Sequence, residues 1–155
     1  MKEHDLVKDF TLQNEQGATV RLSDFAGRPV VLFFYPKADT PGCTIEACGF
    51  RDIFEAIQKG GVVVLGISRD TPHSQKKFKD KYKLPYTLLA DVDEVVCKQF
   101  DVLREKNMYG KKVMGIERTT FLIGPDQRLL KIFPKVKPEG HAEEVLRAIK
   151  AAKAA

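Results

Sequence analysis

Residues 30–50 read VVLFFYPKADTPGCTIEACGF, an apolar run that passes through a loop into a segment with helical spacing. The run Val30–Tyr35 shows no polar alternation, which is typical of a strand covered on both faces by helices. Val62–Ser68 repeats that signature, and Thr44–Lys59 between the two runs places apolar side chains near helical spacing. Strand, helix and strand of these lengths predict a βαβ unit with parallel strands.

The sequence on either side predicts the rest of the fold. Phe10–Gln13 and Thr19–Leu22 alternate around a turn at residues 14–17, which indicates an N-terminal hairpin. Downstream we expect a helix over Pro72–Lys83, a strand over Thr87–Ala90, a short helix over Glu94–Phe100, an antiparallel hairpin of Thr119–Ile123 and Leu129–Phe133, and an amphipathic helix over Glu139–Lys153 with Val145, Leu146 and Ile149 inward. This order predicts an α/β fold: a thioredoxin-like central mixed sheet flanked by helices, with an N-terminal β-hairpin added.

Length and composition set the class of protein. A chain of 155 residues fits a single domain over residues 1–155, and 43% hydrophobic with 30% charged residues indicates a soluble, globular protein. No apolar run approaches the roughly 20 residues that a membrane helix needs. The charged start at residues 1–5 has no apolar stretch behind it, so we expect no secretory signal and, by default, a cytoplasmic location.

The cysteines, histidines and basic runs restrict the function further. Three cysteines in a reducing compartment are no disulfide framework, and the odd count raises the question of a reactive thiol. His4, His73 and His141 are spread out and no Cys/His cluster has ligand spacing, so we expect neither a metal nor a cofactor. Lys76–Lys83 and Lys106–Lys112 contribute to the net charge of +5; we interpret them as a solvated helix face and a loop, with no nucleic-acid partner, because they lack aromatic interleaving.

Cys43 is the candidate reactive thiol, because it falls where the loop turns into the helix. Backbone N–H groups in the first helical turn have no intrahelical partner, and the helix dipole adds partial positive charge, so a thiolate is stabilised there. The Thr40 hydroxyl can hydrogen-bond the sulfur or a small ligand. Pro36 has no N–H and a fixed φ, so it can wall a pocket without a competing donor, and Gly42 allows the backbone to come close to a small ligand.

Arg118 is the candidate cation of this site. It immediately precedes the expected strand Thr119–Ile123, which in a thioredoxin-like sheet neighbours the strand ending at Tyr35. Its guanidinium, always charged and rigidly forked, could then reach the Cys43 sulfur. An arginine at a strand edge is more often a surface charge, and local sequence leaves that alternative open.

The pattern Pro-x-x-x-Thr-x-x-Cys, formed here by Pro36, Thr40 and Cys43, resembles the peroxiredoxin active-site motif. The continuation CTIEAC at residues 43–48, YPK ahead of it and Arg118 within ERTTFLI are similar to the bacterioferritin comigratory protein group, also called peroxiredoxin Q, over essentially the whole chain. The resemblance implies a peroxidase of hydrogen peroxide and organic hydroperoxides. It also implies that Cys43 is the peroxidatic cysteine, that Pro36, Thr40 and Arg118 form its pocket, and that Cys48 is the resolving cysteine.

The implied reaction oxidises Cys43 to a sulfenic acid, which condenses with Cys48 to a disulfide that thioredoxin, or alternatively glutaredoxin, reduces. In an intact α-helix, residues five apart have Cα atoms roughly 8–9 Å apart, beyond the ~7 Å limit for a disulfide. The first turns of the helix must therefore unwind when the disulfide forms, which Gly42 and Gly49 would ease. An intramolecular pair needs no partner subunit, which fits a monomer.

Several alternatives remain open at this level. Cys48 could be an ordinary core residue, which is also our interpretation of Cys97 in the apolar stretch Val95–Cys97. Glu46 could tune the helix start, act in proton transfer near the thiol, or be a surface carboxylate. A thiol–disulfide oxidoreductase would normally carry Cys-x-x-Cys, which is missing here, and a redox-linked binding or chaperone protein would not explain Thr40 together with Cys43.

Overall fold

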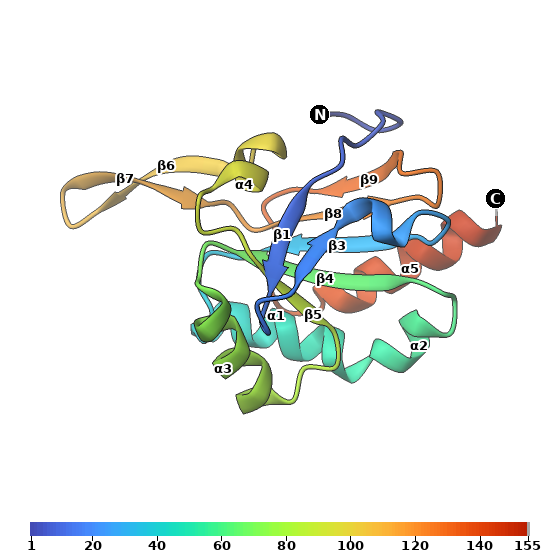
Figure 1. The fold of residues 1–155 in the computed structure, drawn as a ribbon, viewed down its shortest axis with the longest axis horizontal. Coiled ribbons are helices and arrows are strands. Elements are labelled where there is room, and N and C mark those ends of the chain that lie inside the picture. The colour runs from blue at the N-terminus through green and yellow to red at the C-terminus, as the bar shows by residue number, and fades with distance from the viewer. Residues whose placement is uncertain (155) are drawn as a thin grey trace.

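The apolar run of residues 30–34 lies near the centre of a seven-stranded mixed sheet (Figure 1). The structure is a computed structural model that describes residues 1–154, except for the side chains of residues 108, 153 and 154. The strand order is β2-β1-β5-β4-β3-β8-β9. The strands are β1 (Thr11–Asn14), β2 (Thr19–Arg21), β3 (Val30–Phe34), β4 (Val63–Ser68), β5 (Thr87–Ala90), β8 (Thr119–Ile123) and β9 (Leu129–Phe133).

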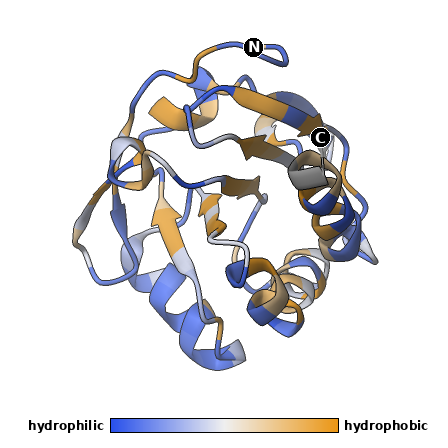
Figure 2. Cartoon of the chain, turned by 90° about the vertical axis from the view of Figure 1, so that its right-hand side faces the viewer, coloured by the Kyte–Doolittle hydropathy of each residue, from blue (hydrophilic) through white to orange (hydrophobic). Residues whose placement is uncertain are grey.

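Both faces of this sheet are covered, which explains why β3 lacks polar alternation. Val31 and Phe33 of β3 face a core shared with four helices, whereas Leu32 and Phe34 face a second core. The first core is covered by α1 (Pro41–Asp52), α2 (Phe54–Gln58), α3 (Pro72–Tyr82) and α5 (His141–Ala154), and the second by α4 (Val95–Gln99) and the 3-10 turn η1 (Leu22–Phe25). Figure 2 shows the apolar colouring on the strands and on the helix sides turned toward them.

Most expected elements are confirmed, several of them to the residue. The N-terminal hairpin forms with Leu12 opposite Val20, and β3 and β4 are parallel with Val30 opposite Val63. The expected bounds of β5, β8 and β9 are those observed. Val145 and Ile149 of α5 are buried in the first core and Leu146 packs against it, as expected. The helices described within residues 1–154 include none with the length and apolarity of a membrane span.

The single helix expected over Thr44–Lys59 is wrong at its start and in its middle. The helix begins at Pro41, because Thr40 before it is extended. Proline suits the first helical position, since its fixed φ matches a helix and an N–H there would have no partner within the helix. The helix is also interrupted at Ile53 (φ −113°, ψ 12°), after which α2 restarts and places Ile57 in the first core. Hydrophobic spacing does not register a break of one residue.

The loop expected at Lys106–Lys112 is also wrong, because these residues form a hairpin that projects from the body (Figure 1). Strands β6 (Leu103–Met108) and β7 (Lys111–Ile116) pair antiparallel, with Met108 opposite Lys111. The two residues between the strands, Tyr109 and Gly110, both have positive φ, as a type I′ turn requires. Apart from its base, most of the hairpin is exposed, so no alternation of apolar and polar residues marked it as strand.

Candidate active site

Cys43 is the third residue of α1, and its side chain is buried directly beneath the loop that leaves β3. The first backbone bond of the helix runs from the Thr44 N–H to the Thr40 carbonyl, at 2.8 Å. Thr40, the N-cap residue, makes no side-chain cap bond. The N–H groups of the first turn thus keep their positive ends turned toward the loop, the arrangement that stabilises an anion or a thiolate.

The loop from Pro36 to Thr40 is pinned from two sides. The Ala38 N–H donates to Asp70 Oδ2 at 2.8 Å, and the Ser68 hydroxyl donates to the same oxygen at 2.6 Å. Asp39, in the left-handed region at φ 59°, accepts from Lys81 Nζ at 2.8 Å and from the Tyr82 hydroxyl at 2.7 Å. The end of β4 and the last turn of α3 therefore fix the loop above Cys43.

Thr40 and Pro36 lie in this loop as the sequence predicts. The Thr40 hydroxyl donates to the Lys37 carbonyl at 2.8 Å, so its hydrogen is engaged and its lone pairs remain able to accept a bond from a ligand. Pro36 directly follows Tyr35 and is half-buried. Its function as a pocket wall stays a prediction.

Arg118 reaches Cys43 from the neighbouring strand. Strands β3 and β8 pair with Phe34 opposite Thr119, so the residue before β8 comes to the same sheet edge as the loop after β3. Arg118 Nη2 donates to Cys43 Sγ at 3.4 Å. Gly42 makes room for this approach, because a Cβ there would lie 3.0 Å from Arg118 Nη2. Gly42 thus admits a side chain of the protein itself, beyond the ligand that the sequence suggested.

Glu46 holds the other arm of the same guanidinium. Arg118 Nη1 donates to Glu46 Oε1 at 2.9 Å, and the Glu46 side chain is fully buried. Burial raises the pKa of Glu46 to about 7, against the opposing effect of the charge and the hydrogen bond of Arg118. Burial acts to lower the pKa of Arg118, but the charges of Glu46 and Cys43 prevail and raise it, so the guanidinium stays charged. The interpretation of Glu46 as a surface carboxylate is therefore wrong.

His141, the first residue of α5, is a buried member of the site that sequence reasoning missed. Its Nε2 lies 2.7 Å from the Thr120 hydroxyl and its Nδ1 lies 3.0 Å from Glu144 Oε1. The rings of Phe50 and Phe133 meet the imidazole edge to face. No local signal in the sequence connects His141 to Cys43, because only the packing of α5 against α1 brings them together.

The other two cysteines lie in different places. Cys48 is half-buried on the same intact helix as Cys43, and both thiols are free. Burial raises the pKa of the Cys48 thiol, with Arg51 lowering it and Asp52 raising it. Cys97 is fully buried in the second core, across the sheet from Cys43, and burial followed by the hydrogen bond to Asp91 raises its pKa strongly.

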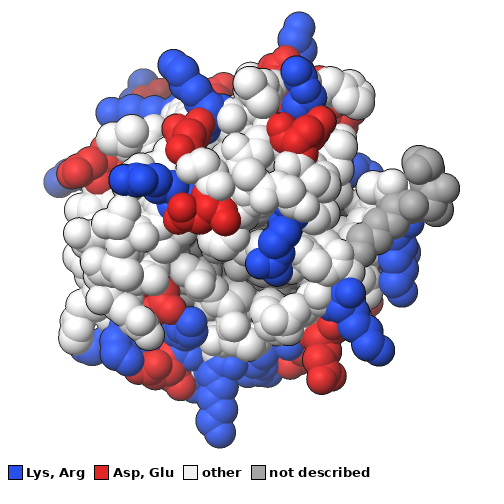
Figure 3. Space-filling model, turned by 45° about the vertical axis from the view of Figure 1, so that its right-hand side comes forward, with Lys and Arg blue, Asp and Glu red and all other residues white. Residues whose placement is uncertain are grey.

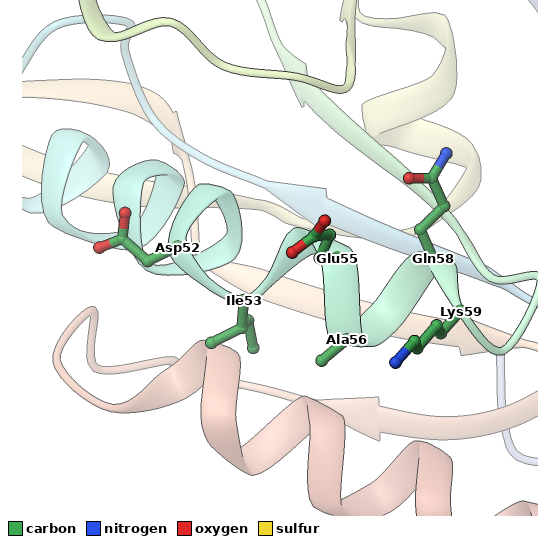
Figure 4. Close-up of a pocket in the computed structure, with 6 residues that line it drawn as sticks. All are labelled: Asp52, Ile53, Glu55, Ala56, Gln58 and Lys59. Carbon is green, nitrogen blue, oxygen red and sulfur yellow. The ribbon is translucent and has the colours of Figure 1, made fainter.

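A hollow lies away from Cys43, at the break between α1 and α2, and none of the described cysteines or histidines lines it. It has a volume of about 600 Å³ and is lined at the break between α1 and α2 by Asp52, Ile53, Glu55, Ala56, Gln58 and Lys59 (Figure 4). Charge is mixed on the face drawn in Figure 3, where basic and acidic side chains alternate.

The sequence and the fold of this chain are similar to those of known proteins. A sequence model described as the AhpC/TSA family matches residues 4–132. The chain is 46% identical over 142 residues to peroxiredoxin Bcp of Bacillus subtilis, covering 92% of this chain and 90% of the relative. It superimposes on bacterioferritin comigratory protein of Xanthomonas campestris, described for its alkyl peroxide reduction activity, with a TM-score of 0.88, 43% identity and coverage of 92% and 91%. The TM-score with PrxQ of Xylella fastidiosa is 0.94, at 39% identity and 99% and 98% coverage.

Proposed function

Since this chain belongs to the AhpC/TSA family and is a thiol-dependent peroxidase of the peroxiredoxin type, we propose that Cys43 is the sulfur that attacks the peroxide and that Cys48 resolves the product. The observation that carries the assignment is the 3.4 Å contact from Arg118 Nη2 to Cys43 Sγ at the start of α1. It places a permanent cation and a helix N-terminus on the same buried sulfur, which is what a reactive thiolate needs.

In the first step a lone pair of the Cys43 thiolate attacks the terminal O–H oxygen of the hydroperoxide. The S–O bond forms as the O–O bond breaks, the sulfur becomes a sulfenic acid, and the leaving oxygen takes up a proton to give water or an alcohol. The lone pairs of Thr40 accept the O–H of the peroxide, since the hydroxyl hydrogen of Thr40 is engaged by Lys37. Arg118 and the N–H groups of the first turn stabilise the negative charge that moves onto the leaving oxygen.

In the second step the Cys48 thiolate attacks the sulfenic sulfur, hydroxide leaves and is protonated to water, and a Cys43–Cys48 disulfide forms. Both cysteines lie on one unbroken helix, whose geometry keeps their Cα atoms too far apart for that bond. The raised pKa of Cys48 also disfavours its thiolate while α1 is folded. Local unwinding of α1 therefore solves both problems. It lets the Cα atoms of Cys43 and Cys48 come close enough for a disulfide, and it exposes Cys48 to water, which favours its thiolate.

Oxidation should raise amide hydrogen exchange over residues 44–51, because disulfide formation breaks the helical hydrogen bonds of this segment. We expect protection to fall by at least about tenfold there, the change that loss of roughly 1.4 kcal/mol of local stability would give. The measurement is exchange followed by mass spectrometry on reduced and oxidised protein, with the α3 peptide over residues 72–82 as the internal reference. Equal protection of residues 44–51 in the two redox states would contradict the unwinding step.

A thiol reductant returns the disulfide to two thiols, and we propose that it is thioredoxin, with glutaredoxin as the second candidate. An intramolecular disulfide needs no second subunit, which supports a monomer as the working unit. Cys43 and Cys48 are free thiols, as a disulfide that forms only during turnover in a reducing cytoplasm requires. We propose hydrogen peroxide and organic hydroperoxides as the substrates, supported by the alkyl peroxide activity described for the Xanthomonas campestris relative.

Turnover with thioredoxin, its reductase and NADPH tests the assignment of the resolving cysteine. Cys48→Ser should lower steady-state peroxide turnover by about tenfold or more, because the sulfenic acid then lacks its intramolecular partner. Cys97→Ser is the matched control and should keep wild-type turnover, since Cys97 lies across the sheet from the site. The reverse outcome, with turnover lost in Cys97→Ser and kept in Cys48→Ser, would exchange the two assignments.

A further inference from the structure

A tyrosine outside the thiol site holds the middle of α1 by a buried hydrogen bond. The Tyr86 hydroxyl donates to the Ala47 carbonyl at 2.6 Å, and Tyr86 is 3% exposed. Ala47 lies inside α1, so its carbonyl also accepts the helical bond from the Arg51 N–H. A carbonyl oxygen has two lone pairs and can accept both bonds. Tyr86 therefore adds a bond to a helix that is already complete at this point.

The Tyr86 side chain is fixed in place by its surroundings. Its ring meets Phe33 edge to face and Phe54 at a tilt, with ring centroids 5.7 Å and 6.0 Å away. Pro85 before it has a fixed φ, and Leu84 is buried in the same core. Burial raises the pKa of Tyr86 well above its ordinary value, so the hydroxyl keeps its hydrogen and stays a donor.

A second bond ties α1 to the same stretch of chain on the other side of Cys48. Arg51 Nη1 donates to the Tyr82 carbonyl at 2.8 Å, at the last turn of α3. Positions 47 and 51 of α1 are thus both bonded to residues 82–86, and Cys48 lies between them. The Arg51 side chain is 35% exposed, so water competes for its bond, whereas the bond of Tyr86 is shielded from water. We therefore expect Tyr86 to contribute more to holding this part of α1.

Formation of the disulfide has to break the Tyr86 bond. Ala47 lies between Cys43 and Cys48 in the chain, and the two cysteines are too far apart while α1 is intact. Unwinding between them changes the backbone dihedrals at Ala47, and its carbonyl turns away from a hydroxyl that the core holds in place. The buried hydroxyl then lacks an acceptor until water reaches it, which makes the opening of α1 less favourable.

We propose that Tyr86 is a positioning residue for the resolving step: through the Ala47 carbonyl it holds α1 in its folded form and sets how readily Cys48 reaches Cys43. The proposal rests on the function proposed for the two cysteines. It makes Tyr86 a determinant of the resolving rate, although the reaction of Cys43 with peroxide does not use its hydroxyl.

A longer-lived folded form has a chemical consequence. While α1 stays folded, the sulfur of the Cys43 sulfenic acid can attack the terminal oxygen of a second hydroperoxide. A second S–O bond forms as the O–O bond breaks, the sulfur is oxidised to a sulfinic acid, and the leaving oxygen takes up the proton that the sulfenic acid gives up, which yields water or an alcohol. Tyr86 therefore also biases the sulfenic acid between the disulfide and the sulfinic acid.

Tyr86→Phe removes the hydroxyl and keeps the ring, so it tests the bond alone. Amide exchange over residues 44–51 of the reduced protein should become about fivefold faster, the change in opening equilibrium expected from one net hydrogen bond. Rapid mixing with one equivalent of hydrogen peroxide, followed by acid quench and mass spectrometry, should show Cys43–Cys48 disulfide formation faster by the same factor. The second-order rate constant of the reduced protein with hydrogen peroxide should stay at the wild-type value. A faster resolving step is a result that general damage to the fold does not give.

Ile123→Val is the matched control, because it shortens a buried side chain in the second core, on the face of the sheet away from α1. It should leave the exchange of residues 44–51 and both rate constants unchanged. In excess hydrogen peroxide the yield of Cys43 sulfinic acid should be about fivefold lower in Tyr86→Phe than in the wild type and in Ile123→Val.

Equal exchange and equal rates of disulfide formation in Tyr86→Phe and the wild type would overturn the role of Tyr86 alone. A wild type that forms no Cys43–Cys48 disulfide would contradict the function proposed for Cys48 and, with it, the role of Tyr86 in resolution. The mass of the oxidised wild type, two hydrogens below that of the reduced protein when the disulfide forms, distinguishes these two failures.

Discussion

Replacing Cys43 with serine should lower the rate constant for peroxide consumption by more than about a thousandfold, the scale on which an enzyme loses activity with its nucleophile. A hydroxyl in the same position remains protonated near neutral pH and offers no thiolate for the attack on the O–O bond. The helix start and Arg118 are left intact, so the loss isolates the sulfur. The measurement is single-turnover consumption of hydrogen peroxide by the reduced protein, without a recycling system.

Cys97→Ser is the control for this experiment, since it removes a buried thiol in the second core and leaves the site untouched. After one equivalent of peroxide, a probe specific for sulfenic acid should label Cys48→Ser, in which the sulfenic acid cannot condense to the disulfide, but not Cys43→Ser. Retention of wild-type peroxide consumption in Cys43→Ser would remove the basis of the mechanism.

Replacing Arg118 with methionine should lower the same rate constant by about a hundredfold to a thousandfold, the range found when one preorganised charge-stabilising donor is removed. The guanidinium donates to Cys43 Sγ with one arm and to Glu46 with the other, so methionine removes both bonds while keeping similar length. The rate constant of Arg118→Lys should lie between those of the wild type and Arg118→Met, because the lysine ammonium keeps the charge but lacks the forked pair of N–H donors. Arg128→Met, at an exposed turn, is the matched control.

The same substitution should also lower the free energy of unfolding by about 1–3 kcal/mol, the cost of leaving a buried polar group unsatisfied. Glu46 would lose its cation and take up a proton, since it cannot remain charged while fully buried. Urea denaturation at neutral pH measures this change. Full activity in a folded Arg118→Met protein would show that the contact with Cys43 serves structure alone.

Local sequence determined two things: the strands that are buried on both faces of the sheet, and the position of the Cys43 thiol at the start of a helix. The unbroken apolar runs predicted β3 and β4 because a strand covered on both faces has no polar alternation to show. Cys43 at a helix start was predictable because the loop and the helix are consecutive in the chain. Local patterns failed at Ile53 and at the β6–β7 hairpin, where a single backbone break and an exposed turn leave no trace in hydrophobic spacing.

The tertiary structure decided which residues from distant parts of the chain meet at the sulfur. Arg118 lies 75 positions from Cys43 in the chain and reaches it because β8 pairs with β3 in a particular register. Packing of α5 against α1 brings His141 to Glu46, and the sheet itself separates Cys97 from both. Charges act through space, so the partners that tune a buried thiolate are set by where the chain folds back, which no local pattern of residues records.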